Sequence, residues 1–170
     1  VVSLMTTTGF TISDFASWPT ILPEFIMILG LIGCCAGSTT GGIKLIRVLV
    51  SFKHSIILLK KNLHPAAIVK TMHEGESLRD EAINAIMGYI ILFFYVFFVL
   101  LLALIYSGLD LQNAFTSLAA CIANVGAGIN QVNIDDTHKA VKVILTFAML
   151  VGRIEITSFF VILLPTFWRA

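Results

Sequence analysis

An otherwise apolar region of this chain is interrupted by Gly33-Cys34-Cys35-Ala36-Gly37-Ser38-Thr39-Thr40-Gly41-Gly42. Apolar sequence leads in over residues 21–32 and leads out over residues 43–59. Neither flank is long enough to cross a membrane alone, since a spanning helix needs about 20 apolar residues. Non-helical backbone at membrane depth is tolerated only where protein buries it or where it lines a water-filled cavity. The interruption therefore indicates a pore or a substrate pathway, although a plain loop between two short helices would leave the same pattern.

The composition is that of an integral membrane protein. Of the 170 residues, 58% are hydrophobic and 12% are charged, whereas soluble domains are about 45–50% apolar and about 25% charged. The net charge of +1 argues against nucleic acid as a partner. The chain has no Walker, HExxH or GxSxG motif and its three cysteines lack metal-ligand spacing, so we expect no enzyme and no cofactor. Because it begins at Val1, we expect a piece of a longer polypeptide.

The second half of the chain has the pattern of a re-entrant pore loop. Residues 83–107 carry no charge and would form a helix of roughly 37 Å, enough to span the membrane. Residues 111–121, with Asp110 as the expected N-cap, reach only about 16 Å as a helix. A polar glycine turn follows at residues 124–128, and residues 141–168 are long enough to span again.

The start of the chain resembles the end of an earlier copy of this unit. A polar glycine turn at residues 6–10 precedes a span that begins near Pro19. Gly37 follows Gly9 by 28 residues, and Arg153 follows Gly126 by 27. We therefore expect the interruption and Arg153 to lie at a similar depth below the two turns. Residues 44–79 hold seven of the eleven Lys and Arg residues, which predicts that this side is cytoplasmic.

The two glycine turns are suited to a cation filter. A filter needs several carbonyl oxygens directed at one axis, and glycine adopts the required backbone angles without a Cβ penalty. Thr7-Thr8-Gly9 and Asn124-Val125-Gly126 meet this demand, and a half-helix that ends at the turn directs its negative end toward the ion. Each turn could equally be a simple link between two helices.

Arg153 is a charge in the middle of a span. Such a charge costs roughly 2.5–3.5 kcal/mol on insertion scales, so it usually faces a bundle interior or a cavity. Glu155 is only two residues away and does not face Arg153 on one helix. We expect Arg153 to reach the carbonyls and hydroxyls of residues 33–42, either as an electrostatic barrier or as a structural tie between helices.

One polar stripe follows the interruption at helical spacing. It faces either a cytoplasmic vestibule, a soluble partner, or simply the water around a helix that leaves the membrane. Its members are Lys44, Arg47, Ser51 and His54.

Four segments together resemble the Trk/Ktr/HKT superfamily of potassium-translocating membrane proteins, and most closely its bacterial Trk-type subunit. They are MTTTGF at residues 5–10, GCCAGSTTGGIK at residues 33–44, NVGAG at residues 124–128 and Gly152-Arg153. The glycine-rich run is the most specific of these, and the resemblance covers essentially the whole chain. One departure is Ala127, where members of the family usually carry proline.

The resemblance implies an all-α membrane protein with membrane–pore-loop–membrane repeats, as in a potassium channel, and an interrupted inner helix. Residues 1–62 would supply the filter loop and broken inner helix of the third repeat, and residues 63–82 a cytoplasmic connector. Residues 83–170 would be the fourth repeat, with outer helix 83–107, pore helix 111–121, filter 122–128 and inner helix 139–170. The earlier repeats of the same polypeptide would be missing, so this piece alone should not conduct.

The resemblance also implies the site residues. The filter would comprise Thr7, Thr8, Gly9, Phe10, Ala123, Asn124, Val125 and Gly126, with potassium held at Thr8, Gly9, Asn124 and Val125. The gate below the filter would comprise Gly33, Gly37, Ser38, Thr39, Thr40, Gly41, Gly42 and Arg153. Potassium would be the substrate.

The family's assembly implies several partners. We expect a multi-pass protein in the lipid bilayer of a bacterial inner membrane, paired as a homodimer, with a TrkA-like cytosolic nucleotide-binding ring on its basic face. Two other functions stay open. One is a secondary transporter with its substrate site at the broken helix, and the other is a non-conducting membrane assembly subunit.

Overall fold

The structure is a computed structural model that describes residues 2–10, 18, 21–33, 41–63, 72–73, 76–77, 79–126, 138–165 and 167–169. Helices dominate these residues. In chain order they are α1 (Val2–Met5), α2 (Ile21–Ile32), α3 (Leu45–Leu63), α4 (Asp80–Tyr106), α5 (Leu111–Ile122), α6 (Lys139–Ile154), α7 (Ile156–Leu163) and the 3-10 helix η3 (Phe167–Arg169). Two short strands, β1 (Met72–His73) and β2 (Glu76–Ser77), pair antiparallel between α3 and α4. The expected all-α fold is confirmed, with this small hairpin as the departure from it among the described residues.

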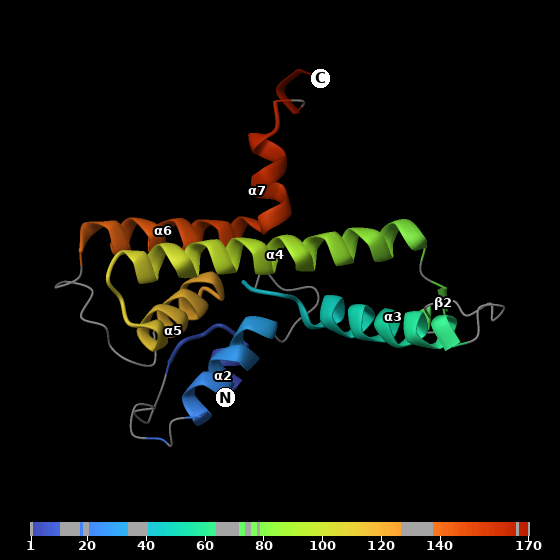
Figure 1. The fold of residues 1–170 in the computed structure, drawn as a ribbon, viewed down its shortest axis with the longest axis horizontal. Coiled ribbons are helices and arrows are strands. Elements are labelled where there is room, and N and C mark those ends of the chain that lie inside the picture. The colour runs from blue at the N-terminus through green and yellow to red at the C-terminus, as the bar shows by residue number, and fades with distance from the viewer. Residues whose placement is uncertain are drawn as a thin grey trace.

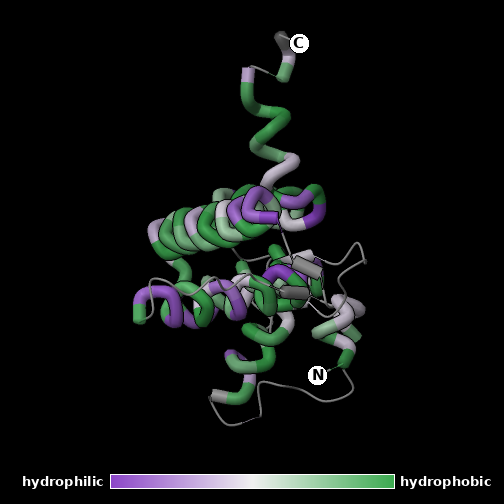
Figure 2. The backbone as a smooth tube through the Cα atoms, turned by 90° about the vertical axis from the view of Figure 1, so that its right-hand side faces the viewer, coloured by the Kyte–Doolittle hydropathy of each residue, from purple (hydrophilic) through white to green (hydrophobic). Residues whose placement is uncertain are grey.

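Helix α4 is the longest described element. Its 27 residues correspond to about 40 Å, more than the hydrocarbon core of a bilayer. Among the described residues it is the one helix able to span on its own, and α6 with α7 could form a second, bent span. Figure 1 shows α4 and α6 running side by side, and Figure 2 shows how far apolar residues extend along the helices. On α4, Phe93 and Phe97 are buried while Phe94 and Phe98 are exposed, as expected for a helix with one face toward protein and one toward lipid.

Helix α5 forms the centre of the described fold. It packs against α2, α4 and α6, and residues 116–123 are all buried. Small side chains, such as Ala119 and Ala120, let the neighbouring backbones approach closely, which is how membrane helices pack without a hydrophobic driving force. With 12 residues the helix reaches about 18 Å and cannot span a membrane. Asp110 occupies the expected N-cap position, but its side chain makes no hydrogen bond to the helix.

The two inner helices of the chain are both discontinuous. The first consists of α2 and α3, which are separated by residues 33–44, and this confirms the expected interrupted helix. An inner helix was expected over residues 139–170, and the structure has two α-helices in that range, α6 and α7. Helices α6 and α7 meet at Glu155 with a bend of 101°, so that α7 turns away from α6 in Figure 1. The backbone of Glu155 has φ 65° and ψ 129°, values that no helix can continue through.

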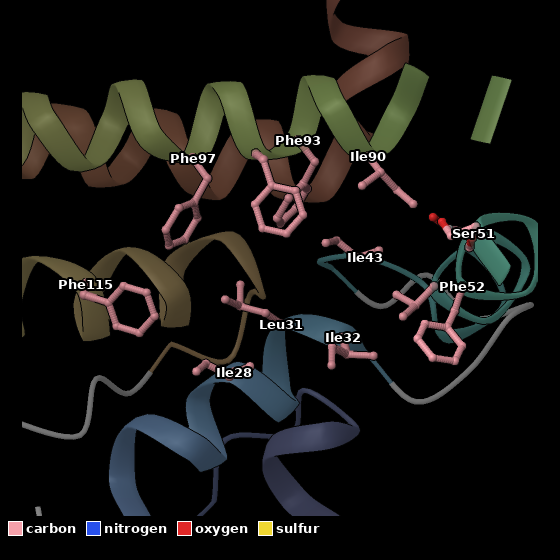
Figure 3. Close-up of a pocket in the computed structure, with 13 residues that line it drawn as sticks. Ile28, Leu31, Ile32, Ile43, Ser51, Phe52, Ile90, Phe93, Phe97 and Phe115 are labelled. Atoms are coloured by element: carbon pink, nitrogen blue, oxygen red, sulfur yellow. Dashed lines mark hydrogen bonds between the residues drawn. The ribbon is translucent and has the colours of Figure 1, made fainter. Parts of the chain in front are cut away.

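An apolar cavity of about 550 Å³ lies between α2, α3 and α4. Figure 3 shows side chains from these helices and from α5 around it, including Leu31, Phe52, Phe93 and Phe115. Among the described residues that line it, the polar ones are Ser51 and Ser55, so this lining carries no charge and few oxygen atoms.

Candidate functional site

Each of the two predicted glycine turns directly follows a helix, and the two have the same hydrogen-bond pattern. The first turn covers residues 6–9 after α1, and the second covers residues 123–126 after α5. In the first, the amides of Thr6, Thr7 and Thr8 donate to the carbonyls of Val2, Leu4 and Ser3 at 2.9, 3.2 and 2.8 Å. In the second, the amides of Ala123, Asn124 and Val125 donate to the carbonyls of Ala119, Cys121 and Ala120 at 3.0, 3.1 and 3.0 Å. Both are helix ends of the Schellman type, which use carbonyls that would otherwise lack partners.

The backbone angles of the two turns also correspond. Thr7 and Gly9 have φ of +54° and +78°, and Asn124 and Gly126 have φ of +57° and +86°. The residue between each pair, Thr8 or Val125, is not in the left-handed region. An alternation of left-handed and right-handed backbone reverses successive peptide planes, and this lets consecutive carbonyls face the same side. Thr7 holds a φ value that costs a β-branched residue about 1–2 kcal/mol, so its conformation must be enforced by its surroundings, whereas Asn124 adopts this region more readily.

The structure brings the two turns together. A Cβ added at Gly9 would collide with the carbonyl oxygen of Val125, and it would lie 3.5 Å from the carbonyl carbon of that residue. Only glycine permits so close an approach of two backbones. A residue from the start of the chain therefore lies directly against the turn that ends α5. This contact joins the two turns that this chain is predicted to contribute to a filter.

The other predicted filter residues differ in exposure. Ala123 and Val125 are buried, and Thr8 and Phe10 are exposed. The hydroxyls of Thr6 and Thr8 share a hydrogen bond of 2.9 Å. The carbonyl of Phe10 accepts a 2.6 Å hydrogen bond from the hydroxyl of Ser3. This bond ties the Phe10 carbonyl to α1 and uses one of the two lone pairs of its oxygen.

The ends of the interruption meet each other beneath the second turn. The Ile43 amide donates to the Leu31 carbonyl at 2.8 Å, and a Cβ at Gly42 would collide with that same carbonyl. A Cβ at Gly33 would lie 3.4 Å from the carbonyl oxygen of Gly41. The chain therefore leaves α2 and returns toward α3 through a narrow neck formed by residues 33 and 41–43. Of the predicted gate, Gly37, Ser38, Thr39 and Thr40 lie outside the described residues.

Gly41 and Gly152 both lie against the end of α5. A Cβ at Gly41 would come within 2.8 Å of the carbonyl oxygens of Ile122 and Ala123 and of the Asn124 amide nitrogen. A Cβ at Gly152 would collide with the carbonyl oxygen of Ile122. The near edge of the interruption and the last turn of α6 therefore contact the same residue. Their shared neighbour is the C-terminal end of α5, which carries the partial negative charge of the helix dipole.

Arg153 follows Gly152 in the last turn of α6, and its side chain is exposed. A contact was predicted between Arg153 and residues 33–42, and residues 34–40 of that segment lie outside those described. The described residues place Arg153 one position from the backbone contact between α6 and α5. Arg153 therefore follows directly after the residue of α6 that contacts the end of α5, and Gly41 of the interruption contacts the same end.

The sequence analysis missed a polar cluster at the bend between α6 and α7. The Lys44 ammonium contacts Glu155 Oε1 at 2.5 Å, and Arg47 Nη2 contacts Glu155 Oε2 at 3.2 Å. Further along α3, the Ser51 hydroxyl contacts the Met87 sulfur of α4 at 3.4 Å. The first part of the predicted polar stripe thus faces protein, rather than a vestibule or water. Glu155 is the only acidic residue between 139 and 170, and this could have marked it as a partner for cations elsewhere in the chain.

In the described part of the chain, no three His, Cys, Asp or Glu side chains gather as a metal site. Oxygen ligands for a monovalent cation would come from backbone carbonyls and threonine hydroxyls instead. The arrangement can thus supply a row of neutral oxygen dipoles beside a helix C-terminus. That environment can replace part of the hydration shell of a cation without binding it too tightly to leave.

Comparisons with known proteins agree on one family. The model of the TrkH family, described as a cation transport protein, matches residues 1–168. The chain is 39% identical to the Trk system potassium uptake protein TrkH of Vibrio parahaemolyticus and to that of Escherichia coli K12, and 33% identical to TrkG of Escherichia coli K12. Each match covers 99% of this chain and 35% of the relative. The crystal structure of the potassium transporter TrkH from Vibrio parahaemolyticus superposes with a TM-score of 0.89 at 39% identity, over 99% of this chain and 36% of that one. The chain thus spans about a third of the length of these relatives.

Proposed function

Because this chain belongs to the TrkH family of cation transport proteins, we propose that it forms part of a pathway that takes up potassium ions through a filter of backbone carbonyls. Potassium is the transported substrate, and the proposed role involves no chemical reaction and no cofactor. The relatives of the chain named as potassium uptake proteins support the choice of ion. The observation that carries the filter is the contact between two turns with the same backbone geometry, residues 6–9 and 123–126.

The filter proposal follows from the alternation of backbone angles. With left-handed φ at Thr7 and Gly9, and at Asn124 and Gly126, each turn can present consecutive carbonyls to a shared axis. Thr8, Gly9, Asn124 and Val125 are the residues proposed to bind potassium. The C-terminal end of α5 would add a negative dipole near the second turn. Two further turns from the rest of the polypeptide would complete the ring of oxygens.

The gate proposal concerns residues 33–42 together with Arg153. The neck of this segment lies against the end of α5, beside the second turn. The segment itself would then extend across the pathway below the filter, where Arg153 adds a positive charge that repels potassium. Opening would require the segment to move aside while its neck stays anchored by the hydrogen bond between Ile43 and Leu31.

Deletion of residues 33–42 tests the gate. We expect the full-length protein with this deletion, reconstituted in liposomes, to take up rubidium several-fold faster than the wild type. Arg153→Gln should also raise the flux, whereas Arg153→Lys, which keeps the charge, should stay near wild type. The folded state of each variant is checked by its elution on size-exclusion chromatography. An unchanged or lower flux in a folded deletion variant would show that the segment does not gate the pathway.

The domain assignment follows from the same proposal. Residues 1–62 would be the filter loop and broken inner helix of a third pore-loop repeat, residues 63–82 a cytoplasmic connector, and residues 83–170 a fourth repeat. The protein would cross a bacterial inner membrane several times and pair as a homodimer. A nucleotide-binding ring would dock on the cytoplasmic side, where Lys60 and Lys61 end α3. These assignments are supported by the match over the whole chain to membrane subunits of Trk systems.

A further inference from the structure

The side chains behind the two glycine turns differ, although the backbones of the turns correspond. In the first turn, the carbonyl of Ser3 accepts the amide of Thr8 at 2.8 Å. In the second, the carbonyl of Ala120 accepts the amide of Val125 at 3.0 Å. Ser3 therefore corresponds to Ala120, and it carries a hydroxyl where the second turn has a methyl group.

Ser3 is bonded to three successive residues of the first turn. Its carbonyl accepts the amides of Thr8 and Gly9 at 2.8 and 3.2 Å. Its hydroxyl donates to the Phe10 carbonyl at 2.6 Å. In a trans peptide the carbonyl points opposite to the amide hydrogen of the next residue. The carbonyls of Thr7 and Thr8, which precede the two bonded amides, therefore both point away from Ser3, toward the same side.

The hydroxyl of Ser3 fixes the point where the chain leaves this row of carbonyls. The 2.6 Å distance to the Phe10 carbonyl is at the short end of the range for hydrogen bonds between a hydroxyl and an oxygen. Phe10 directly follows Gly9, which has φ of +78° and, as a glycine, a wide choice of backbone angles. The bond therefore restrains the chain beside the residue that can move most easily.

The hydroxyl of Thr6 determines the direction of the Thr8 hydroxyl proton. Thr6 Oγ1 lies 2.9 Å from the Val2 carbonyl oxygen and 2.9 Å from Thr8 Oγ1. A carbonyl can only accept, and a hydroxyl has a single proton. Thr6 therefore donates to Val2, and Thr8 donates to Thr6. The Thr8 hydroxyl oxygen is left with lone pairs and no free proton, which is the state that suits a cation.

The second turn is held in another way. Ala123 and Val125 stand where the first turn has Thr6 and Thr8, and they are 2% and 7% exposed. Packing restrains this turn, whereas hydroxyl groups restrain the first. The two turns meet where Gly9 lies against the Val125 carbonyl. A shift of the first turn would therefore also change its distance from the second.

We propose that Ser3 and Thr6 are positioning residues for ion selectivity. The Ser3 hydroxyl holds the end of the first turn, and the Thr6 hydroxyl keeps the Thr8 proton away from the ion. Both residues act through their neighbours and do not contact the ion. This inference rests on the proposed filter function of the two turns. Loss of either hydroxyl would let the oxygens of the first turn adjust to a smaller cation, so the preference for potassium over sodium would fall.

The variant Ser3→Ala tests the proposal in the full-length protein reconstituted in liposomes. The measured quantity is the ratio of rubidium uptake to sodium uptake, followed with radioactive ions. We expect this ratio to fall by about 2-fold to 12-fold, which corresponds to the net worth of one hydrogen bond, about 0.5–1.5 kcal/mol. Ser3→Thr, which keeps a hydroxyl, should retain a ratio near wild type. A merely structural role would lower the amount of folded protein and both fluxes together, and would leave the ratio unchanged.

Two further variants make the test specific to these hydroxyls. Thr6→Val keeps the branched side chain and removes the hydroxyl, so it should also lower the ratio, whereas Thr6→Ser should not. The matched control is Ser55→Ala in α3. Ser55 is exposed, and its hydroxyl donates to the Ser51 carbonyl at 2.9 Å. The control loses the same kind of bond away from the turns and should keep the wild-type ratio. Elution on size-exclusion chromatography checks that each variant is folded.

The outcomes separate this inference from the filter proposal. If folded Ser3→Ala and Thr6→Val both keep the wild-type ratio, the positioning role is wrong and the filter stands. If Ser3→Thr fails to restore the ratio, or if Ser55→Ala lowers it equally, the hydroxyl of Ser3 is not the cause and the positioning role is again wrong. If the wild type itself does not prefer rubidium over sodium, the filter proposal fails, and this inference fails with it.

Discussion

Alanine at position 152 would place a methyl group against the backbone of α5. The added Cβ would lie 2.9 Å from the carbonyl carbon and 3.0 Å from the Cα of Ile122, with the carbonyl oxygen closer still. Ordinary van der Waals contact begins near 3.4 Å, so α6 would have to move back by at least about 0.5 Å. Backbone atoms cannot rotate away as a flexible side chain can. The variant Gly152→Ala therefore measures directly how closely the inner helix packs on the end of α5.

The expected change in the free energy of unfolding follows from two opposing contributions. Helix propensity favours alanine over glycine by about 1 kcal/mol. Overpacking typically costs about 1–3 kcal/mol, and a gap of 0.5–1 Å forfeits a quarter to a half of each dispersion contact along the buried face of α6. That face includes Ala148 and Val151, which are 0% and 1% exposed. We expect a net loss of up to about 2 kcal/mol in the free energy of unfolding.

Gly88 supplies the matched control. Gly88 also lies within a helix, α4, but it is exposed, and an added Cβ would meet no atom within 4 Å. Gly88→Ala should therefore show the propensity term alone, a gain of about 0.5–1 kcal/mol. The two variants are compared in the full-length protein by SDS titration in mixed micelles, followed by tryptophan fluorescence. Equal stability of the two variants would refute the close packing of α6 on α5, and with it the shared contact of α6 and Gly41 with Ile122.

Three further predictions concern the turns and the core. Gly9→Ala should reduce rubidium flux through the full-length protein more strongly than Gly126→Ala. Both positions have positive φ, but only a Cβ at residue 9 meets the opposite turn. Equal losses of flux would contradict the contact between the turns. Gln112 donates a 2.6 Å hydrogen bond to Glu24, so a double-mutant cycle with Gln112→Leu and Glu24→Ala should give a coupling of about 0.5–1.5 kcal/mol, and a coupling of zero would argue against that bond. Cys121 is 5% exposed and should react with a maleimide only after denaturation; rapid labelling of the folded protein would place the end of α5 at a solvent-accessible surface.

Much of the fold could be predicted because the relevant signals are local. The free energy of moving a residue into the bilayer depends mainly on its own side chain, so the uncharged run of α4 and the short run of α5 could be recognised from their lengths. Glycine at positions 9 and 126 indicated turns because glycine alone adopts left-handed backbone freely. The left-handed φ of Thr7 could not be recognised in this way, since a β-branched residue reaches it only under constraint from its surroundings.

The partners of the charged residues could not be predicted, because helical periodicity relates a residue only to others on its own helix. Helical periodicity predicted that Arg153 and Glu155 do not face each other on one helix, but it could not indicate that Glu155 contacts Lys44 and Arg47. For the same reason the sequence predicted one inner helix over residues 139–170 and no bend, since residues near 155 include no proline. The bend coincides with ion pairs to a distant segment, and these form only when α3 packs beside α4.

The order of spans, half-helix and glycine turns follows from residue chemistry along the chain, because hydropathy and backbone preference act over a few neighbours. The meeting of Gly9 with Val125, of Gly41 and Gly152 with Ile122, and of Glu155 with its two cations was decided only in three dimensions. Each of these contacts joins segments far apart in the sequence. Their existence depends on how closely whole helices approach, which is a property of packing rather than of any one stretch of residues.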